Sequence, residues 1–253
     1  MKIAFIGGVK FSFEILSTIL HSGWDVSVVF SYDDTKKKYY SDIENFGELT
    51  RKYNVKHIQV DNINNEKNIQ ILQEIQPDLI LVMGWSQLLN SKIIKIPKLG
   101  VIGSHPTELP KFRGRAPIPW SILKKLKESA LTFFYINEGI DDGDILDQRK
   151  FDISDEDDAT SIYQKMIDLG QSMILDNLLD IKNNQHTRTK QNQSKFIENW
   201  PKRTMEDGRI NWNDSSEEIH RLIRATTSPY PGSFTTFNQE KLIIWKSNFL
   251  DDS

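Results

Sequence analysis

The sequence of 253 residues contains no cysteine, and this absence removes several kinds of site at once. Without a thiol the chain has no cysteine nucleophile, no disulfide, no CxxC redox motif and no cysteine-ligated zinc. A chain without disulfides suits a reducing compartment, so we expect the protein to act in the cytoplasm.

Long apolar runs and an excess of charge of one sign are missing as well. No apolar stretch approaches the roughly 20 residues that span a bilayer. The N-terminal segment MKIAFIGGVKF lacks the apolar core and the small-residue cleavage site of a signal peptide. Because 32 basic residues stand against 35 acidic ones, the formal net charge is only −3. We therefore expect no membrane partner and no general attraction to nucleic acid.

What is present is an alternation of strand patterns and helix patterns. Short apolar runs predict strands, and segments with apolar residues at helical spacing predict helices between them. Such an alternation indicates an α/β fold with a Rossmann-like, mostly parallel sheet. The predicted strands are Lys2–Ile6, Trp24–Phe30, His57–Val60, Leu79–Met83, Gly100–Ser104, Leu131–Ile136 and Leu146–Ile153. The predicted helices cover 13–20, Gly47–Tyr53, Glu66–Ile75 and Asp158–Ile181.

The last quarter of the chain has a different pattern. From Asn183 to Gln193 the sequence is strongly polar, which is typical of a linker. Ser215 and Glu218 then form a capping-box pattern at the start of a helix. The segments PYPGSFTTF and KLIIW flank NQE as the strands of a hairpin would. We therefore expect a catalytic domain over 1–185, a linker over 186–199 and a small C-terminal helix-plus-hairpin unit over 200–253.

Two positions at predicted strand ends have the residue types of a ligand site. Gly7 and Gly8 follow the first strand, but GGVKF is not the GxGxxG pattern of a dinucleotide site. We interpret these glycines as a turn that brings the start of a helix close to a polar ligand. His105 follows the fifth strand, at the edge where α/β sheets place their ligands. No histidines form HxH or HExxH pairs, so we predict no metal site.

The segments around His105 and after the sixth strand are both open to more than one interpretation. The run PTELPKFRGRAP suits either a shaped cationic pocket rim or a rigid loop with solvated arginines. The run from Asn137 to Asp144 holds three aspartates and two glycines. It can bind calcium, although it lacks the EF-hand spacing, or form a solvated turn. It can also supply a carboxylate that pairs with His105 to make a general base.

Taken together, GVIGSHPTELPKFRGRAPIPW and LTFFYINEGIDDGDILDQ resemble the core of the 10-formyltetrahydrofolate-dependent formyltransferases. The resemblance extends to PDLILVMGWSQLL and to EDGRINW with IHRLIRATTSPYPGSF, so it spans most of the chain. It is strongest to the nucleotide-sugar N-formyltransferases. This resemblance implies a homodimeric enzyme of surface-polysaccharide and lipopolysaccharide synthesis that uses 10-formyltetrahydrofolate.

The resemblance also implies roles for individual residues. His105 matches the catalytic histidine that handles the proton of the attacking amine, and Asp141 matches the carboxylate that tunes it. The segments that match folate contacts contain Gln87, Leu88, Leu89, Arg115, Asn137, Glu138, Gly139 and Ile140. The implied acceptor is a nucleotide-linked amino sugar, for which the candidate contacts are Lys10, Arg113, Lys202, Arg203 and Tyr230, with Tyr39, Tyr40 and Trp200 as further aromatics that can stack on a base.

One departure from the family's motif concerns the oxyanion. The motif usually reads N-x-H, with the Asn amide as a donor, whereas this chain has Gly103-Ser104-His105. Losing such a donor typically costs about 2.7–4 kcal/mol. We expect the N–H of Gly103 or Ser104, the Ser104 hydroxyl or a water to replace it.

Two other functions compete with the sugar enzyme. The first is methionyl-tRNA formyltransferase, but the segment after Trp200 has mixed charge, which argues against a tRNA-binding surface. The second is a non-catalytic homologue that binds folate or a nucleotide sugar. Turnover with 10-formyltetrahydrofolate separates this binding protein from both enzymes.

Overall fold

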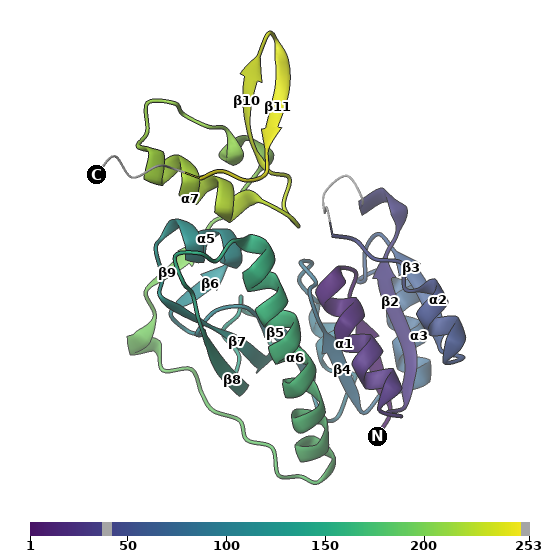
Figure 1. The fold of residues 1–253 in the computed structure, drawn as a ribbon. Coiled ribbons are helices and arrows are strands. Elements are labelled where there is room, and N and C mark those ends of the chain that lie inside the picture. The colour runs from purple at the N-terminus through teal and green to yellow at the C-terminus, as the bar shows by residue number, and fades with distance from the viewer. Residues whose placement is uncertain (37–41, 249–253) are drawn as a thin grey trace.

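The computed structural model describes residues 1–36 and 42–248, which fold into an α/β domain carrying a small C-terminal unit (Figure 1). The strands are β1 (Ile3–Ile6), β2 (Val26–Tyr32), β3 (Lys56–Val60), β4 (Leu79–Val82), β5 (Val101–His105), β6 (Phe112–Gly114), β7 (Glu128–Tyr135), β8 (Ile145–Asp152), β9 (Glu198–Trp200), β10 (Ser233–Phe237) and β11 (Glu240–Ile244). The α-helices are α1 (Lys10–His21), α2 (Gly47–Lys52), α3 (Glu66–Ile75), α4 (Ser91–Ile94), α5 (Pro117–Leu123), α6 (Ala159–Lys182) and α7 (Ser216–Thr226).

The main sheet has seven strands in the order β3-β2-β1-β4-β5-β7-β8. Strands β1 to β5 run parallel to one another. Strand β7 runs antiparallel to β5, and β8 runs antiparallel to β7. The strand order reverses at β1, which has β2 on one side and β4 on the other. Such a switch point opens a crevice at the carboxyl ends of the strands. The predicted fold class, with a mostly parallel sheet, is confirmed.

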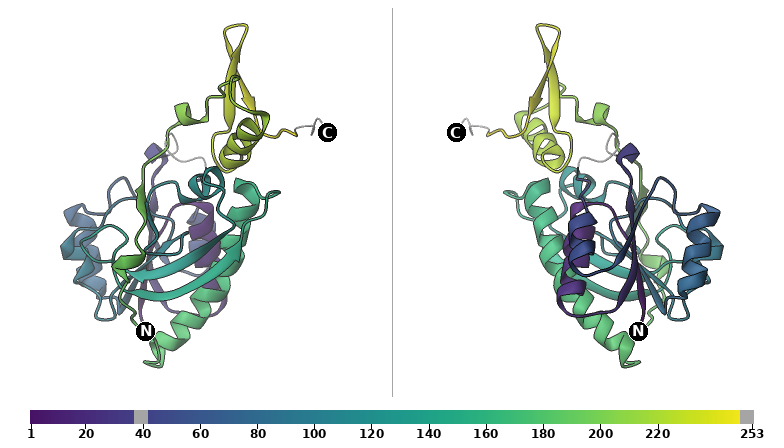
Figure 2. Two further views of the ribbon diagram at one scale, coloured as in Figure 1. Left: turned by 90° about the vertical axis from the view of Figure 1, so that its left-hand side faces the viewer. Right: turned by 90° about the vertical axis from the view of Figure 1, so that its right-hand side faces the viewer.

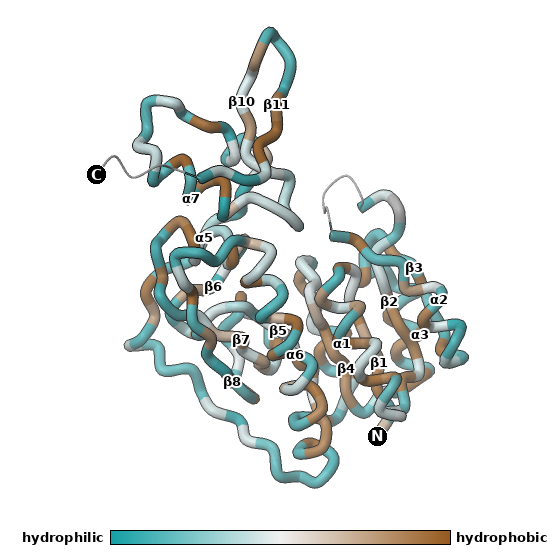
Figure 3. Tube along the Cα trace, in the orientation of Figure 1, coloured by the Kyte–Doolittle hydropathy of each residue, from teal (hydrophilic) through white to brown (hydrophobic). Residues whose placement is uncertain are grey.

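Both faces of the sheet are covered, which explains the continuous apolar runs. In β1, Ile3 and Phe5 belong to one core, whereas Ala4 and Ile6 belong to the other. Helices α1, α2, α5 and α6 pack over the first face, and α3 and α4 pack over the second. Figure 3 shows the resulting concentration of hydrophobic residues in the strands. No helix within 1–36 and 42–248 is long and apolar enough to cross a membrane.

The local signals that predicted the C-terminal unit are confirmed. The N–H of Glu218 donates to the Ser215 hydroxyl, and the N–H of Ser215 donates to the Glu218 carboxylate, as a capping box requires. Strands β10 and β11 are antiparallel and joined through Asn238 and Gln239. Both joining residues have positive φ, which suits the twist of a two-residue hairpin turn. Figure 2 shows that this hairpin projects away from the α/β domain.

The polar segment after α6 runs as extended chain along the outside of the domain (Figure 1). The end of this segment is more than a linker, because it forms strand β9, which pairs in parallel with β6. The elements β6, β9, α4 and α5 could not be predicted from the sequence, since three-residue strands and short helices leave no periodic pattern. The domain boundaries at 185 and 200 remain predictions.

Candidate active site

His105 is the last residue of β5 and is only 6% exposed. Its Nε2 lies 3.0 Å from the carbonyl oxygen of Phe112. A carbonyl oxygen only accepts hydrogen bonds, so Nε2 carries the hydrogen that is donated to it. The hydroxyl of Thr107 donates to the same carbonyl at 2.5 Å. The ring is therefore fixed in place, with Nδ1 as the nitrogen left for chemistry.

Asp141 is the carboxylate that lies against this nitrogen. Its Oδ2 is 3.6 Å from His105 Nδ1, within ion-pair distance, and accepts the N–H of Gly114 at 3.0 Å. The loop leaves β7 beside the start of β5, because Ile136 N–H donates to the Val101 carbonyl at 2.8 Å. It must therefore fold back along β5 to reach His105. Of the three interpretations of this loop, the structure supports the pairing of a carboxylate with His105.

A calcium site in the same loop finds no support. Within the parts of the chain that the structure describes, no three His, Asp or Glu side chains gather closely enough to hold a metal ion. The Asp142 carboxylate instead closes over Gly139, where an added Cβ would lie 2.2 Å from its Oδ2.

The loop after His105 contributes backbone groups that sequence analysis missed. The Phe112 carbonyl and the Gly114 N–H, which hold His105 and Asp141, both belong to β6. Gly114 has φ +103, and a Cβ there would lie 2.4 Å from the Trp200 carbonyl of β9. The only sequence signal was the glycine of RGR, because backbone donors and acceptors leave no residue-type pattern.

Gly103 and Ser104 precede His105 in β5 and are paired with Phe134 and Phe133 of β7. An added Cβ at Gly103 would lie 2.9 Å from Ile136 Cδ1 and 3.0 Å from its Cγ1. The volume that a larger residue would need at position 103 is thus already filled by Ile136. Ser104 is half-buried.

The first group of predicted folate contacts lies in the loop after β4. The Gln87 amide accepts the N–H of Ile63 at 3.1 Å and donates to the Asp61 carbonyl at 2.5 Å, so it ties this loop to the one after β3. Leu89 is buried, whereas Leu88 is 66% exposed. An exposed leucine between two anchored residues leaves an apolar surface open at the edge of the sheet.

The second group follows β7 and β6. The Asn137 side chain accepts the N–H of Gly139 at 3.0 Å and thereby shapes the turn. Glu138 is exposed, and Ile140 is 57% exposed. The exposed Arg115 is anchored through its N–H, which donates to the Trp200 carbonyl at 2.9 Å.

The five candidates for acceptor contacts differ in what they offer. Lys10, at the start of α1, and Lys202 are exposed. Nη2 of the Arg113 guanidinium donates to the side-chain oxygens of Gln191 and Gln193, at 2.7 and 3.1 Å. The guanidinium of Arg203 lies over the Trp120 ring at 4.9 Å and donates to the Asp207 carbonyl, and burial lowers its pKa. These contacts favour structural roles for the two arginines.

The aromatic candidates also differ in burial and in how far their rings are open to a nucleotide base. Burial raises the pKa of Tyr230, and the nearby Asp42 carboxylate adds to the increase. Trp200 is buried and stacked on Phe112 with ring centroids 4.6 Å apart, so it offers no open face to a base. Tyr39 and Tyr40 lie outside the described residues.

The donors of the glycine turn after β1 are bonded within the protein, and a polar ligand at this turn remains a prediction. The Ser12 hydroxyl accepts the N–H groups of Gly8 and Val9, both at 3.1 Å. A Cβ at Gly8 would lie 2.2 Å from the Tyr32 ring, and one at Gly7 would lie 2.4 Å from Ser12 Cβ. The helix start is therefore closed by the protein's own side chains.

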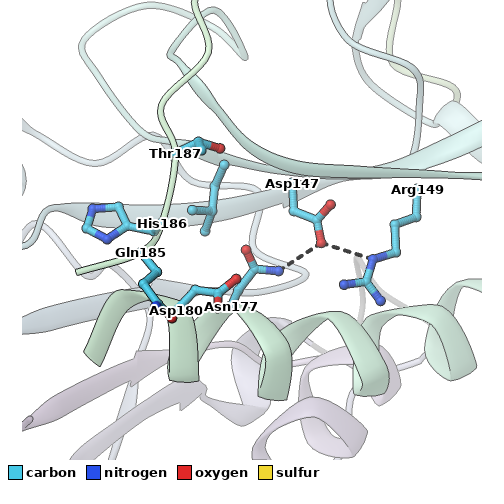
Figure 4. A pocket seen from close by; sticks show the side chains of 8 residues that line it. Asp147, Arg149, Asn177, Asp180, Gln185, His186 and Thr187 are labelled. Atoms are coloured by element: carbon cyan, nitrogen blue, oxygen red, sulfur yellow. Dashed lines mark hydrogen bonds and ion pairs between the residues drawn. The ribbon is translucent and has the colours of Figure 1, made fainter. Parts of the chain in front are cut away.

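A polar hollow of about 240 Å³ lies between β8, the C-terminal half of α6 and the segment 185–187 (Figure 4). Its lining contains none of the predicted site residues. The Asp147 carboxylate already accepts hydrogen bonds from Arg149 at 3.0 Å and Asn177 at 2.9 Å. This hollow is thus separate from the His105 site.

Comparison with known proteins matches two parts of the chain. Residues 1–178 match the formyl transferase family, and residues 202–253 match the C-terminal domain of formyl transferases. The chain is 30% identical to methionyl-tRNA formyltransferase of Ruminiclostridium cellulolyticum over 99% of its own length and 80% of the relative. It is 33% identical to the bifunctional polymyxin resistance protein ArnA of Wigglesworthia glossinidia brevipalpis, over 97% of its length but only 36% of that protein.

Solved structures share the fold at lower identity. A 4-N formyltransferase from Francisella tularensis superposes with a TM-score of 0.76 at 22% identity, covering 98% of both chains. The sugar 3N-formyltransferase WlaRD, solved with dTDP and 5-N-formyltetrahydrofolate, gives 0.71 at 24% identity and covers 96% of this chain and 85% of its own. With its two matched regions and its relatives, this chain belongs to the formyl transferase family, whose formyl donor is 10-formyltetrahydrofolate.

Proposed function

We propose that the protein is an N-formyltransferase that moves the formyl group of 10-formyltetrahydrofolate to the amine of a nucleotide-linked amino sugar. The observation that carries this proposal is the buried His105 ring with Asp141 Oδ2 at 3.6 Å from its Nδ1. A histidine paired with a carboxylate at a sheet's carboxyl edge is the arrangement of a general base. In this role the enzyme would modify sugars for surface polysaccharide or lipopolysaccharide.

The tautomer of His105 decides which nitrogen acts. Because Nε2–H donates to the Phe112 carbonyl, the neutral ring presents an unprotonated Nδ1. The acceptor amine attacks the formyl carbon, a new C–N bond forms, and the C–N bond to N10 of the donor breaks. His105 Nδ1 takes the proton that the amine loses, and Asp141 stabilises the charged ring. The proton finally reaches N10 of the departing tetrahydrofolate.

The residues at the edge of the sheet fit a folate. Leu88 and Ile140 expose apolar side chains from the loops after β4 and β7, and both loops are held by internal hydrogen bonds. Apolar side chains beside fixed backbone groups suit a flat heterocycle, which needs stacking area and a few directional hydrogen bonds. We assign Gln87, Leu89, Arg115, Asn137, Glu138 and Gly139 to the same donor site.

For the acceptor we favour a small phosphorylated sugar over a nucleic acid. Many cations of the C-terminal unit are neutralised within the protein: Arg209 pairs with Glu206 at 2.9 Å, and Arg221 pairs with Glu217. The exposed Lys10 and Lys202 remain as candidates for a diphosphate, and Tyr230 for the base. A few cations are sufficient for a diphosphate, whereas tRNA requires many phosphate contacts.

Methionyl-tRNA is the second candidate acceptor, because several relatives of about 30% identity bear the name methionyl-tRNA formyltransferase. The experiment is a turnover assay of the purified protein with 10-formyltetrahydrofolate. Acceptors are methionyl-tRNA and a panel of nucleotide-linked amino sugars that differ in base and in amine position. We expect saturable formylation of a nucleotide sugar and none of methionyl-tRNA at low or moderate salt. Efficient, salt-sensitive formylation of methionyl-tRNA alone would overturn the proposal.

We also propose that the protein is a homodimer joined through its C-terminal hairpin. Phe237 and Leu242 expose apolar side chains on one face of β10 and β11, and the exposed Trp212 hydrogen-bonds to Thr235 on that face. A second copy is the partner whose surface repeats this apolar face. Light scattering should give the mass of a dimer for the native chain and of a monomer for Leu242→Glu. A monomeric native chain would contradict the proposal.

A further inference from the structure

A single residue of the polar segment after α6 is buried, and its neighbours are not. Gln191 is 7% exposed, whereas Lys190 and Asn192 are exposed. The residue lies outside every helix and strand, so no repeating backbone ladder accounts for its burial. A buried amide in irregular chain has to be explained by the partners it meets.

Most of those partners are backbone groups of the loop that carries Asp141. The Gln191 Nε2 donates to the carbonyl oxygens of Asp141 and Gly143, both at 2.8 Å. Its Oε1 accepts from the Arg113 guanidinium at 2.7 Å. Both amide hydrogens and the amide oxygen are therefore in use, and a flipped amide would set its oxygen against two carbonyls. The orientation of the amide is fixed by its surroundings.

The loop held by Gln191 needs such support. Asp141 has φ +50, in the left-handed region, which is less favourable for a residue with a Cβ even though Asp adopts it more readily than most. Only its Oδ2 meets the His105 side of the site, through the 3.6 Å ion pair and the Gly114 N–H. The two hydrogen bonds from Gln191 to the carbonyls of Asp141 and Gly143 hold the backbone that carries this carboxylate.

The same segment is anchored on both sides of Gln191. Upstream, Thr189 and Ile145 exchange two backbone hydrogen bonds of 2.9 and 2.8 Å. Downstream, β9 pairs with β6, whose Phe112 carbonyl and Gly114 N–H hold the two members of the pair. The segment around Gln191 is therefore held by backbone hydrogen bonds on both sides, and it contacts the strand and the loop that carry the partners of His105.

We propose that Gln191 is a positioning residue, which sets the distance between Asp141 and His105 through its hydrogen bonds to the carbonyls of Asp141 and Gly143. This proposal rests on the proposed function only because it assumes that Asp141 assists His105 during formyl transfer. The hydrogen bond from Gln191 to the Asp141 carbonyl places it one residue contact away from His105, so in this proposal it acts on the rate through Asp141.

The test compares three variants of the full chain. Gln191→Glu keeps an acceptor for Arg113 but loses both donors, so it separates the contact with Asp141 from the contact with Arg113. Gln193→Ala is the matched control, because Gln193 also bonds to Arg113 but not to Asp141. We expect kcat to fall about 10- to 100-fold in Gln191→Ala and Gln191→Glu, as small misplacements of a catalytic group do. The KM values for both substrates should change little, and Gln193→Ala should stay within about twofold.

A double-mutant cycle then tests whether Gln191 acts through Asp141. In an Asp141→Asn background, Gln191→Ala should lower kcat much less than in the native background, because coupled residues are not additive. Additive effects, or equal losses in Gln193→Ala and Gln191→Ala, would overturn the proposal. Retained activity in Gln191→Glu would do the same, since Arg113 would then be the partner that matters.

A measurement without substrates keeps this test independent of the proposed function. In the protein labelled with ¹⁵N at histidine, the His105 ring resonances should move in Gln191→Ala and stay unchanged in Gln193→Ala. Unchanged His105 resonances in Gln191→Ala would overturn the proposal even if no acceptor is turned over. Shifted resonances without turnover would leave the positioning role standing and remove the proposed reaction.

Discussion

The turn after β1 and the loops after β5 and β7 belong to one sheet but differ in what fills them. After β1, the Ser12 hydroxyl takes the N–H groups at the start of α1, and Tyr32 packs on Gly8. At the end of β5, His105 is held by a backbone carbonyl and faces a carboxylate. A glycine turn at a strand end can bind a polar ligand only where the chain itself leaves the backbone N–H groups of the turn unoccupied.

The largest effect should come from the site itself. We predict that His105→Ala lowers kcat by about 10²–10⁴-fold, the usual contribution of a positioned general base. His57→Ala is the control, because this ring bonds to Ser31 at 2.8 Å between β2 and β3 and not to the site. Steady-state kinetics with circular dichroism would check both variants. Near-normal turnover of a folded His105→Ala would remove the residue from the mechanism.

The carboxylates of the loop 137–144 should differ in effect. We predict that Asp141→Asn lowers kcat about 10- to 100-fold, because a neutral amide no longer stabilises the charged ring. Asp144→Asn should stay within about twofold, since Asp144 is tied in through its backbone carbonyl, which accepts the Tyr135 N–H. Equal losses of kcat in the two variants would show that the assignment of Asp141 is wrong.

Much of this arrangement could be predicted from sequence, and the reason is visible in particular residues. The apolar runs of β1 to β5 are continuous because both faces of the sheet are buried, so the strands were recognisable. His105 and Asp141 stood out through the resemblance to formyltransferases. The capping box of α7 needed only Ser215 and Glu218, three residues apart.

The remaining features depend on contacts between distant segments. Gln191 looked like any residue of a polar linker, because its partners are about fifty residues away in the chain. The pairing of β6 with β9 involves strands too short to show periodicity. The closure of the Gly7–Gly8 turn depends on Tyr32, which the turn's own sequence does not contain.

Substitutions in the turn after β1 should change the stability of the protein rather than its catalytic rate. We predict that Ser12→Ala lowers the free energy of unfolding by about 1–3 kcal/mol, because two buried N–H groups lose their acceptor. The kcat of the folded protein should not change. Ser17→Ala on the same helix, where the hydroxyl meets the exposed His21, is the control for urea unfolding. A selective loss of kcat would instead make this turn part of the site.

Asp157 offers the contrast of a structural carboxylate with Asp141. Burial raises the pKa of Asp157, but hydrogen bonds from Lys165, the Ser154 N–H and the Ser161 and Ser154 hydroxyls outweigh it and bring the pKa to about 2. A folded-state pKa below the usual 3.8 stabilises the protein above pH 4, by about 2 kcal/mol. That stability is lost as the pH falls from about 4 to 2. Urea unfolding should show Asp157→Asn less stable at pH 7, with the difference shrinking over that window and kcat unchanged.

The smallest effect should come from restoring the family's asparagine. We predict that Gly103→Asn does not raise kcat, because an added Cβ would meet Ile136 at 2.9 Å and because we expect another donor to replace the asparagine amide. The double variant Gly103→Asn with Ile136→Ala removes the steric obstacle, so it tests the donor alone. If this oxyanion donor were truly missing, the double variant should gain about 10²–10³-fold in kcat. We expect no such gain, and Ile136→Ala alone is the control that separates the effect of the cavity from the effect of the amide.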